Sequence, residues 1–357
     1  MNIGIYDPYL DTMGGGEKYM LTAASCLSKN NNVSIFWEQK SVQEIKKIAN
    51  SRFGFDLSSI RFTKNIFSKN ISFLERHTQL RKYDAIFYLS DGSIPLLLSR
   101  KLVLHFQFPV NWVCASLLTR TKFASIKNVV CNSYYTKKYI DKTFSTKSIV
   151  VYPPANDYEF KKIPKKNIIL TVGRFNPMPG GGNFKKLDVM ITIFKEMIDT
   201  GAKNWELYVV ASFKKQEEGE IAKLEETVEN YPIFIMKNIP YEKLNDFYLR
   251  SKIYWHGAGY GEDLENHPER AEHFGIATVE AMKNGAVPVV ISAGGQPEIV
   301  KEGVNGFLWN TKEELIRKTI HLIENPKILE KISQNSRLIS NTFSMEKFCS
   351  EINSVFK

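Results

Sequence analysis

The feature that most constrains the fold is a regular alternation of short apolar runs with longer helical stretches along the 357 residues. The runs are rich in β-branched and aromatic residues, which is typical of buried strands. Strands that alternate with helices favour βαβ units and parallel sheets. The expected strands are Ile3–Tyr6, Val33–Trp37, Ala85–Leu89, Leu102–Phe106, Asn128–Cys131, Ser148–Tyr152, Ile168–Val172, Glu206–Ala211, Ile233–Met236, Ile253–Trp255, Val287–Ile291 and Gly306–Leu308.

The length and the position of Pro153-Pro154 predict two domains. A chain of this size is long enough for two domains of ordinary size, and the two prolines divide the twelve strands into two sets of six. We therefore predict two doubly wound, Rossmann-like α/β domains, residues 1–155 and 156–344. Ligands of such sheets bind at the carboxyl ends of the strands, so the catalytic site is expected in an interdomain cleft. Residues 345–357 form a final amphipathic helix.

The most informative motif contains two carboxylates, Glu272 and Glu280, separated by seven residues. Helix formers fill Ile276–Asn284, and Gly285 follows as a helix-ending residue. The turn at His273–Gly275 therefore offers free backbone amides and the positive end of a helix dipole, which is a site for an anion. Glu280 in the second turn could accept hydrogen bonds from ribose, and Glu272 from sugar hydroxyls. Incidental glutamates on a solvated helix are the alternative.

This segment resembles the nucleotide-sugar signature of the GT4 family of retaining glycosyltransferases, which have the GT-B fold. The resemblance implies a GT-B architecture, whose final helix, residues 345–357 here, packs back on the first domain. It also implies that the carboxylates at the two positions contact the donor sugar and the ribose respectively. The residues that carry the resemblance are Glu272, His273, Phe274, Gly275, Ile276 and Glu280.

A second candidate for phosphate binding follows the first strand of the second domain. Arg174 ends that strand region, and Lys185 and Lys186 stand where the next helix begins. Arginine pairs bidentately with phosphate oxygens, whereas lysine acts as a mobile point charge. In the family that the chain resembles, an arginine and a lysine at these places grip the donor diphosphate, and the helix register selects Lys185. The glycines at 180–182 lengthen the spacing, so Lys186 stays open, as does a surface turn with solvated cations.

The first domain offers two further candidates. Gly15 and Gly16 open its first helix, and glycines there let the backbone approach a phosphate or a sugar, although the spacing is not that of a dinucleotide fingerprint. The resemblance implies that this loop closes over the donor; a plain tight turn is the alternative. His105 lies at the carboxyl end of a strand, and the resemblance implies a place near the transferred sugar. A satisfied structural histidine is the alternative there.

The charge is concentrated in the first half. Residues 1–155 hold 21 Lys and Arg against 10 Asp and Glu, a net charge of +11, whereas the remainder holds 27 against 28, a net charge of −1. This asymmetry favours an anionic partner for the first half, such as a membrane surface, a lipid phosphate or nucleic acid. In the densest part, Arg61–Lys82, basic and apolar residues interleave as in an interfacial segment. A solvated basic face is the alternative.

The composition indicates where in the cell the protein is expected and whether its cysteines are paired. No apolar stretch reaches the eighteen residues that a membrane-spanning helix needs, and the first residues enter a strand without a signal-peptide pattern. We therefore expect a cytoplasmic protein and leave open a peripheral position on the cytoplasmic membrane face. The four cysteines are scattered, which suggests neither a disulfide framework nor a metal-binding knuckle.

The sequence and the family resemblance together imply a retaining, metal-independent hexosyltransferase. It would move a sugar from a UDP- or GDP-sugar to a hydroxyl of a glycan, a lipid-linked or a polysaccharide acceptor. Glu272 and His105 are the catalytic candidates, and Arg174 and Lys185 would neutralise charge on the leaving diphosphate. No Asp-x-Asp stands in a metal-binding context, so no metal or cofactor is expected.

The expected partners are the donor, an anionic or lipid-linked glycan acceptor and an anionic membrane surface, without nucleic acid. Two alternatives stay open. A sugar-nucleotide epimerase shares the GT-B fold, although the Glu272–Glu280 motif argues against it. A basic nucleic-acid-binding protein would explain the charge, but no recognition motif for nucleic acid is present.

Overall fold

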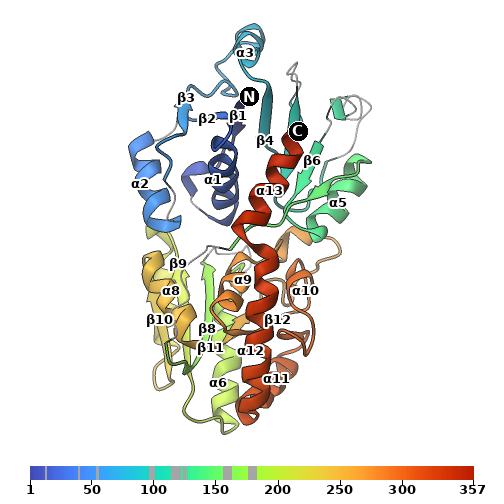
Figure 1. Cartoon of the computed structure of the whole chain (residues 1–357). Coiled ribbons are helices and arrows are strands. Elements are labelled where there is room, and N and C mark those ends of the chain that lie inside the picture. Colours follow the sequence, from blue (N-terminus) through green and yellow to red (C-terminus); the bar gives the residue numbers. More distant parts are fainter. Residues whose placement is uncertain are drawn as a thin grey trace. The chain divides into compact units, whose positions relative to one another are not determined.

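The structure is a computed structural model that describes residues 1–12, 14–38, 41–53, 56–95, 101–113, 122–123, 126, 128–155, 163–175 and 183–357. The chain divides into two compact units (Figure 1). The first unit comprises Met1–Pro154 together with Met345–Lys357, and the second comprises Ala155–Ser344. Each unit is built on a parallel sheet with helices packed against it, and each is described by itself below.

The sheet of the first unit has the strand order β3-β2-β1-β4-β5-β6-β7, and all neighbouring strands are parallel. Such an order arises when the chain first winds outward in one direction from β1 and then returns to wind in the other. The strands are β1 (Asn2–Tyr6), β2 (Asn32–Phe36), β3 (Arg61–Thr63), β4 (Ala85–Leu89), β5 (Leu102–Phe106), β6 (Asn128–Cys131) and β7 (Ile149–Val150).

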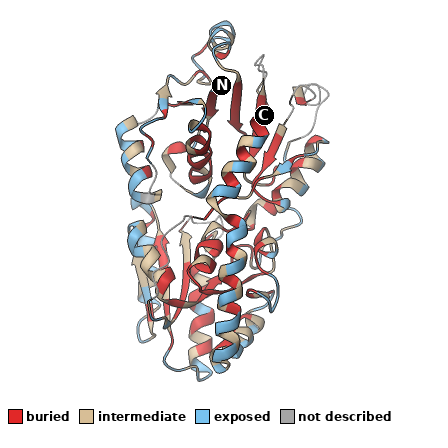
Figure 2. Cartoon of the chain, viewed as in Figure 1, coloured by how far each residue is buried: buried red, intermediate tan, exposed pale blue. Residues whose placement is uncertain are grey.

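Helices cover both faces of this sheet, so its central strands are buried (Figure 2). Alternate residues of one strand enter different cores: Phe87 packs into one, and Ile86 and Tyr88 into the other. At Gly4 an added Cβ would lie 2.6 Å from the Phe36 ring, so the glycine lets that ring lie across β1. The helical elements of the unit are η1 (Leu10–Thr12), α1 (Gly15–Ser28), α2 (Val42–Phe53), α3 (Phe73–Leu80), α5 (Tyr134–Phe144) and α13 (Met345–Phe356).

Helix α13 completes the core of the first unit. Phe348 meets the Tyr19 ring edge to face at a centroid distance of 5.0 Å, and Phe356 meets Phe87 at 5.7 Å. A disulfide joins Cys349 of α13 to Cys26 of α1, with 5.2 Å between the Cα atoms. The scattered cysteines gave no indication of this bond, because 323 residues of sequence separate the two positions. The expectation of no disulfide framework was wrong for this pair.

The second unit repeats the same winding. Its sheet has the order β10-β9-β8-β11-β12-β13, and again all neighbouring strands are parallel. Trp255 and Trp309 are fully buried in a core that the helices close over the sheet. The strands are β8 (Lys166–Arg174), β9 (Glu206–Ser212), β10 (Ile233–Lys237), β11 (Ser251–His256), β12 (Val287–Ile291) and β13 (Phe307–Trp309).

Among the described residues, the second unit has more helical elements than the first. Its helical elements are α6 (Leu187–Asp199), η2 (Lys215–Glu217), α7 (Glu218–Glu226), α8 (Tyr241–Arg250), η3 (Pro268–Arg270), α9 (Ile276–Lys283), α10 (Gln296–Ile299), α11 (Lys312–Glu324), α12 (Pro326–Ser340) and η4 (Asn341–Phe343). None of the helices in the described part of the chain is long and apolar enough to cross a membrane.

The twelve expected strands are all present with both ends within two residues of the predicted positions; β8 is two residues longer at each end, and β7 is the one that is clearly shorter, at Ile149–Val150. The predicted fold class, two doubly wound α/β units, is confirmed. The strand β3 was not predicted. It lies at the start of the basic segment 61–82, where Ile66 and Ile71 are also buried, so part of that segment belongs to the core.

Candidate functional site

The second sheet has a topological switch point between β8 and β11. The chain runs from β8 to β9 on one side of the sheet, whereas β11 lies on the other side of β8. Arg174 is the last residue of β8 and His256 is the last residue of β11, so both lie at the carboxyl edge beside this point. Open α/β sheets bind ligands at this place.

The lysine at the start of α6 is positioned by its neighbours. Asn183 is fully buried, and its side-chain oxygen accepts a hydrogen bond of 3.1 Å from the backbone amide of Leu187, which fixes the first turn of α6. An added Cβ at Gly173 would lie 2.7 Å from the side-chain stem of Lys185. The glycine therefore makes room for that stem beside the end of β8. The Lys185 ammonium forms an ion pair with Oε2 of Glu272.

Glu272 is held by its backbone and by its side chain. Its carbonyl accepts a hydrogen bond of 2.7 Å from the Gly295 amide. Its Oε2 atom contacts Lys185 and lies 2.8 Å from Nε2 of His256, which is buried. Burial raises the pKa of the Glu272 carboxyl, but the Lys185 charge and the His256 hydrogen bond together bring that pKa well below its usual range. Glu272 is therefore an ionised carboxylate.

The turn before α9 depends on a glycine. Gly275 has φ +119°, and an added Cβ would lie 2.6 Å from Nε2 of the buried Gln296. Phe274 anchors the turn by packing its ring 5.4 Å from that of Phe343. His273 donates from Nε2 to the carbonyl of Glu269 at 2.9 Å. The amides of Ile276 and Ala277, the first two residues of α9, have no acceptors within the helix, whereas the Thr278 amide donates to the Gly275 carbonyl at 3.0 Å.

Glu280 lies in the second turn of α9 and is buried. The hydroxyl of Tyr241, the first residue of α8, donates a hydrogen bond of 3.0 Å to its Oε1 atom. Tyr241 comes directly after Pro240, whose extended backbone sets the start of that helix. The two predicted carboxylates of the motif thus lie in one unit, one paired with a lysine and one with a tyrosine.

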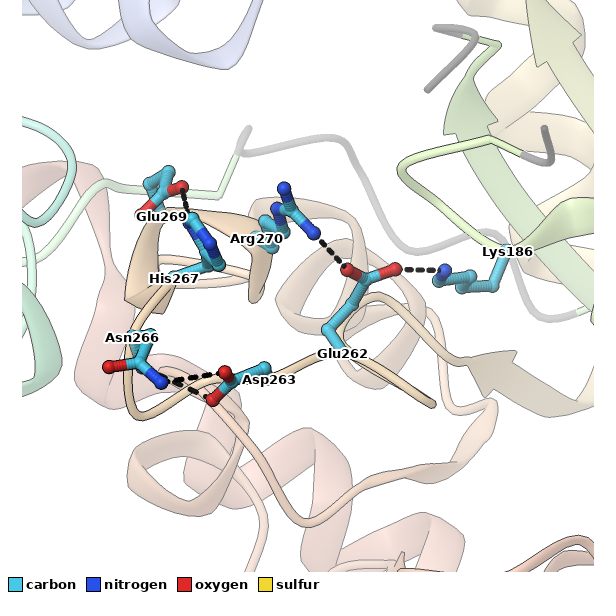
Figure 3. Close-up of polar contacts among 7 residues, drawn as sticks. All are labelled: Lys186, Glu262, Asp263, Asn266, His267, Glu269 and Arg270. Atoms are coloured by element: carbon cyan, nitrogen blue, oxygen red, sulfur yellow. Dashed lines mark hydrogen bonds and ion pairs between the residues drawn. The ribbon is translucent and has the colours of Figure 1, made fainter. Parts of the chain in front are cut away.

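A second ionic cluster surrounds Glu262 (Figure 3). Lys186 forms an ion pair with Oε1 of Glu262, and Arg270 donates to Oε2 at 3.1 Å. Burial raises the pKa of Glu262, but the two cations outweigh it and the pKa is lowered. The two lysines at the start of α6 therefore contact different carboxylates. This arrangement favours Lys185 as the lysine of the Glu272 site.

The glycines at the start of α1 form hydrogen bonds within the first unit. Gly15 begins α1 and is exposed, and the backbone amide of Gly14 donates to the carboxylate of Glu17. The carbonyl of Gly16 accepts a hydrogen bond of 3.0 Å from the side chain of Gln107, and a side chain at position 16 would collide with that glutamine. A donor contact by Gly15 and Gly16 stays a prediction.

His105 is a core residue in this structure. Its side chain is fully buried, stacks on the Tyr19 ring at 4.2 Å and hydrogen-bonds through Nδ1 to the carbonyl of Val130 at 3.1 Å. Burial lowers the pKa of His105 to about 3. A residue with no exposed surface cannot touch a sugar in this conformation. The geometry therefore supports the structural alternative, and the catalytic role predicted for His105 finds no support.

The carboxyl edge of the first sheet carries acidic groups. Asp7 follows β1 directly and is buried; its Oδ1 accepts a hydrogen bond of 2.8 Å from the Tyr9 amide, and Oδ2 has no partner in the described part of the chain. Burial and the nearby Glu17 raise the pKa of Asp7 to about 8. Asp91 lies two residues beyond the end of β4. This edge is unlike that of the second sheet.

Sequence reasoning missed His256, Glu262, Arg270 and Tyr241. His256 directly follows the predicted strand 253–255. A position at the carboxyl end of a strand is the criterion that selects His105, and it holds for His256 as well. The predicted loop glycines 180–182 and residue Met13 lie outside the described residues. Within the described ranges no group of three or more His, Cys, Asp or Glu side chains is arranged to hold a metal ion.

Comparison with known proteins places the chain among glycosyltransferases. Residues 154–339 match the family "Glycosyl transferases group 1". An uncharacterized glycosyltransferase of Methanocaldococcus jannaschii is 24% identical over 84% of this chain and 80% of its own length. A GDP-Man:Man(3)GlcNAc(2)-PP-Dol alpha-1,2-mannosyltransferase of Caenorhabditis elegans is 26% identical over 54% of this chain and 42% of its own length.

A solved structure has the same fold along the whole chain. HepE of Anabaena in complex with UDP-glucose aligns with a TM-score of 0.68 and 15% identity, over 100% of this chain and 99% of HepE. The two parallel-sheet units are thus those of a GT-B glycosyltransferase. Because the family match covers more than half of the chain, this protein belongs to the glycosyl transferases group 1 family.

Proposed function

We propose that this glycosyltransferase is a retaining, metal-independent GT4 hexosyltransferase. It moves a sugar from a UDP- or GDP-sugar to a hydroxyl of a glycan, lipid-linked or polysaccharide acceptor. The observation that carries the proposal is the pairing of Lys185 with Glu272 beside the switch point of the second sheet. A cation for the diphosphate and a carboxylate for the sugar lie next to each other there.

Each group of this site has a role in the proposed reaction. Arg174 and Lys185 neutralise the charge that develops on the diphosphate as the bond to the anomeric carbon breaks. The amides at the start of α9 add a positive dipole end. Glu272 accepts hydrogen bonds from the transferred sugar, and Glu280 from the ribose. The acceptor oxygen bonds to the anomeric carbon on the face that the diphosphate leaves, and its proton passes to the leaving group.

The choice of donor draws on two relatives. HepE carries UDP-glucose in its crystal structure, and the Caenorhabditis elegans relative is a mannosyltransferase named for GDP-Man. We propose UDP-glucose and GDP-mannose as the first donors to try. A cation pair suffices for the diphosphate in this proposal, so no metal ion is required.

Nucleotide binding is the first test. A ligand at one hundred times its Kd stabilises the folded state by about 2.7 kcal/mol, which for a domain of this size corresponds to a shift in Tm of about 5–10 °C. Thermal unfolding is measured with equal concentrations of UDP, GDP, ADP and CDP. Either UDP or GDP should raise Tm, and Arg174→Ala should reduce the shift to about half or less. Equal Tm values with all four nucleotides would refute the proposal.

Transfer is the second test. Radiolabelled UDP-glucose and GDP-mannose are incubated with and without glycan and lipid-linked acceptors, in the presence of EDTA. Release of free nucleotide that depends on the acceptor, with the anomeric configuration kept, supports the proposal. A sugar nucleotide that returns with an altered sugar and no free nucleotide would indicate the epimerase instead. Loss of all activity in EDTA would refute metal independence.

We further propose that the acceptor is held at an anionic membrane, to which the first unit binds through residues 61–82. In this segment Phe73 and Leu74, at the start of α3, are 51% and 78% exposed. Large apolar side chains at the surface next to cations are typical of interfacial segments. The exposed cations of the segment are Arg61, Lys64, Lys69, Arg81 and Lys82.

Co-sedimentation with vesicles tests this surface. Each cation near an anionic bilayer contributes about 1 kcal/mol, so replacing Lys64, Lys69, Arg81 and Lys82 with Gln should reduce binding roughly a thousandfold. Salt should release the wild type from anionic vesicles. The wild type should stay unbound to neutral vesicles at both low and high salt. The matched control replaces four exposed lysines of the second unit, Lys203, Lys301, Lys327 and Lys331. Failure of the wild type to bind anionic vesicles at low salt would refute the membrane proposal.

A further inference from the structure

His256 contacts the carboxylate of the proposed sugar site but takes no part in the proposed steps of transfer. It ends β11 at the switch point, is only 3% exposed, and its Nε2 atom lies 2.8 Å from Oε2 of Glu272. The ammonium of Lys185 contacts the same oxygen. Two groups from different elements, the end of β11 and the start of α6, thus converge on one oxygen of Glu272.

The contacts of the imidazole determine its protonation state. Glu272 is ionised beside Lys185, so its Oε2 atom is an acceptor and Nε2 of His256 must donate. The other ring nitrogen, Nδ1, is buried and has no hydrogen-bond partner in the described part of the chain. A proton on a buried nitrogen without an acceptor is costly. The ring is therefore neutral, with its proton on Nε2.

Electrostatics agree with this assignment. The charged groups that act on His256 are Glu272, which favours the imidazolium, and Lys185, which opposes it. Burial is the largest influence, and the net effect is a pKa below the ordinary value for histidine. His256 therefore stays neutral at pH 7 and serves as a fixed donor.

The second oxygen of Glu272 is left for a ligand. No described residue forms a hydrogen bond with Oε1, and the Glu272 side chain keeps 16% of its surface exposed. A carboxylate that is tethered through one oxygen by two donors has little freedom to rotate, so the direction of Oε1 is set before a ligand arrives. Fixed direction of this kind is how supporting groups improve a binding constellation.

We propose that His256 is a positioning residue, whose Nε2–H holds Oε2 of Glu272 so that Oε1 accepts a hydroxyl of the transferred sugar. This inference rests on the proposed function, since Glu272 acts on the sugar only if the protein is a sugar transferase. It also separates the duties of the two partners. Lys185 can leave Glu272 to meet the diphosphate, whereas the buried imidazole stays in place.

The first experiment does not depend on turnover. Full-length protein labelled with ¹⁵N-histidine is examined by NMR, and the His256 signals are assigned by their loss in His256→Gln. One neutral ring with its proton on Nε2 should be present at pH 8 and persist as the pH falls through the ordinary value of 6.5, and Glu272→Ala should shift its signals. A proton on Nδ1, a midpoint near the ordinary value of 6.5, or signals that do not respond to Glu272→Ala would overturn the inference.

The second experiment uses three substitutions with UDP-glucose and GDP-mannose as donors. The amide of Gln can donate from the position of Nε2, whereas Asn reaches only the position of Nδ1 and Phe cannot donate. We expect His256→Gln to keep kcat within about threefold, and His256→Asn and His256→Phe to lose about 10- to 100-fold in kcat. The Kd of UDP or GDP should stay within about twofold in all three, because the free nucleotide has no sugar.

The outcomes separate this inference from the proposed function. Equal losses in the Gln, Asn and Phe variants, or a parallel loss of nucleotide affinity, would indicate a merely structural histidine and overturn the inference. If the wild type turns over neither donor, the proposed function is at fault, and the NMR experiment alone decides whether Nε2–H holds Glu272. Thermal unfolding of the three variants identifies any that fail to fold.

Discussion

The two sheets wind in the same way, apart from one further strand at the end of the first, but differ in chemistry at their switch points. In the first unit, the edge beside β1 and β4 carries Asp7, Glu17 and Asp91, and the pKa of Asp7 is raised to about 8. In the second unit, the equivalent edge beside β8 and β11 carries Arg174 and a lysine–carboxylate pair. The cations of the second edge suit a diphosphate, whereas the groups named at the first edge are all carboxyl groups.

This difference shows that the net charge of a region does not report the charge of its site. Residues 1–155 have a net charge of +11, yet the amide of Gly14 at the start of α1 is already occupied by the Glu17 carboxylate. The excess cations lie elsewhere, among them the exposed residues of the segment 61–82. The second unit is close to neutral and nevertheless places Arg174 and Lys185 at the carboxyl edge beside the switch point of its sheet.

The largest expected effect on ligand binding tests the cationic edge. A hydrogen bond to a charged group is worth about 1.5–3 kcal/mol, so Arg174→Ala and Lys185→Ala should each weaken UDP or GDP binding by about 10- to 150-fold. Titration calorimetry measures the Kd. The matched control is Lys186→Ala, whose ammonium is held by Glu262 and should matter little. A larger loss in Lys186→Ala than in Lys185→Ala would reverse the assignment of the two lysines.

The acidic edge is tested by Asp7→Asn. The folded pKa of about 8 exceeds the ordinary value of 3.8, so the folded state binds the extra proton between these values. The stability from protonated Asp7 is present below about pH 4 and is lost as pH rises through 8, by about 1.4 kcal/mol for each pH unit. Asparagine does not titrate. The free energy of unfolding of the variant, measured in urea, should therefore increase relative to that of the wild type from pH 5 to pH 8. Parallel curves would show that Asp7 is ionised in the folded state.

A smaller effect is expected for His105→Phe. The folded pKa of about 3 lies below the ordinary value of 6.5, so this histidine contributes stability above pH 6.5 that is lost as the pH falls toward 3. Between pH 6.5 and 5 the wild type should lose about 2 kcal/mol from this group. The variant should lack the hydrogen bond to Val130 at every pH. Its free energy of unfolding should not show this additional decrease between pH 6.5 and 5. An unchanged slope in the variant would place the titrating group elsewhere.

The smallest effect concerns the two carboxylates of the motif. Glu280→Gln keeps an acceptor for the Tyr241 hydroxyl and for ribose but loses the charge, so nucleotide affinity should fall by about 2- to 12-fold. Glu272→Gln should leave nucleotide affinity nearly unchanged while it reduces turnover. Calorimetry with UDP or GDP and initial rates with the matching donor give both quantities. Loss of nucleotide binding in Glu272→Gln alone would exchange the two roles.

Much of the fold could be predicted from the sequence, because hydrophobic periodicity and proline positions report the strands and the division between them. The strand β3 was not predicted, because Arg61-Phe62-Thr63 is short and has one apolar residue. The interleaving of basic and apolar residues after it could not separate Ile66 and Ile71, which are buried, from Leu74, which is exposed. Burial of that kind depends on where the chain turns.

The site was predictable to the level of the motif but not of the contacts. The spacing of Glu272 and Glu280 was visible, whereas the partner of each lysine depends on the register of α6 against β8, which Gly173 and Asn183 set. Two histidines lie near the carboxyl ends of strands, and sequence alone could not tell that His105 stacks in the core while His256 reaches Glu272. Contacts between segments distant in sequence need the tertiary structure.

The place of α13 has a consequence for synthesis on the ribosome. The second unit is one continuous stretch, Ala155–Ser344, so it can fold as soon as that stretch has emerged. The first unit is begun earlier but finished later, because Phe348, Ile352 and Val355 of its core are translated after the whole second unit. Until then a nascent chain exposes the apolar core residues that these side chains pack against. A product truncated before residue 345 would therefore have a complete second unit and an incomplete first unit, although the first unit was synthesised earlier.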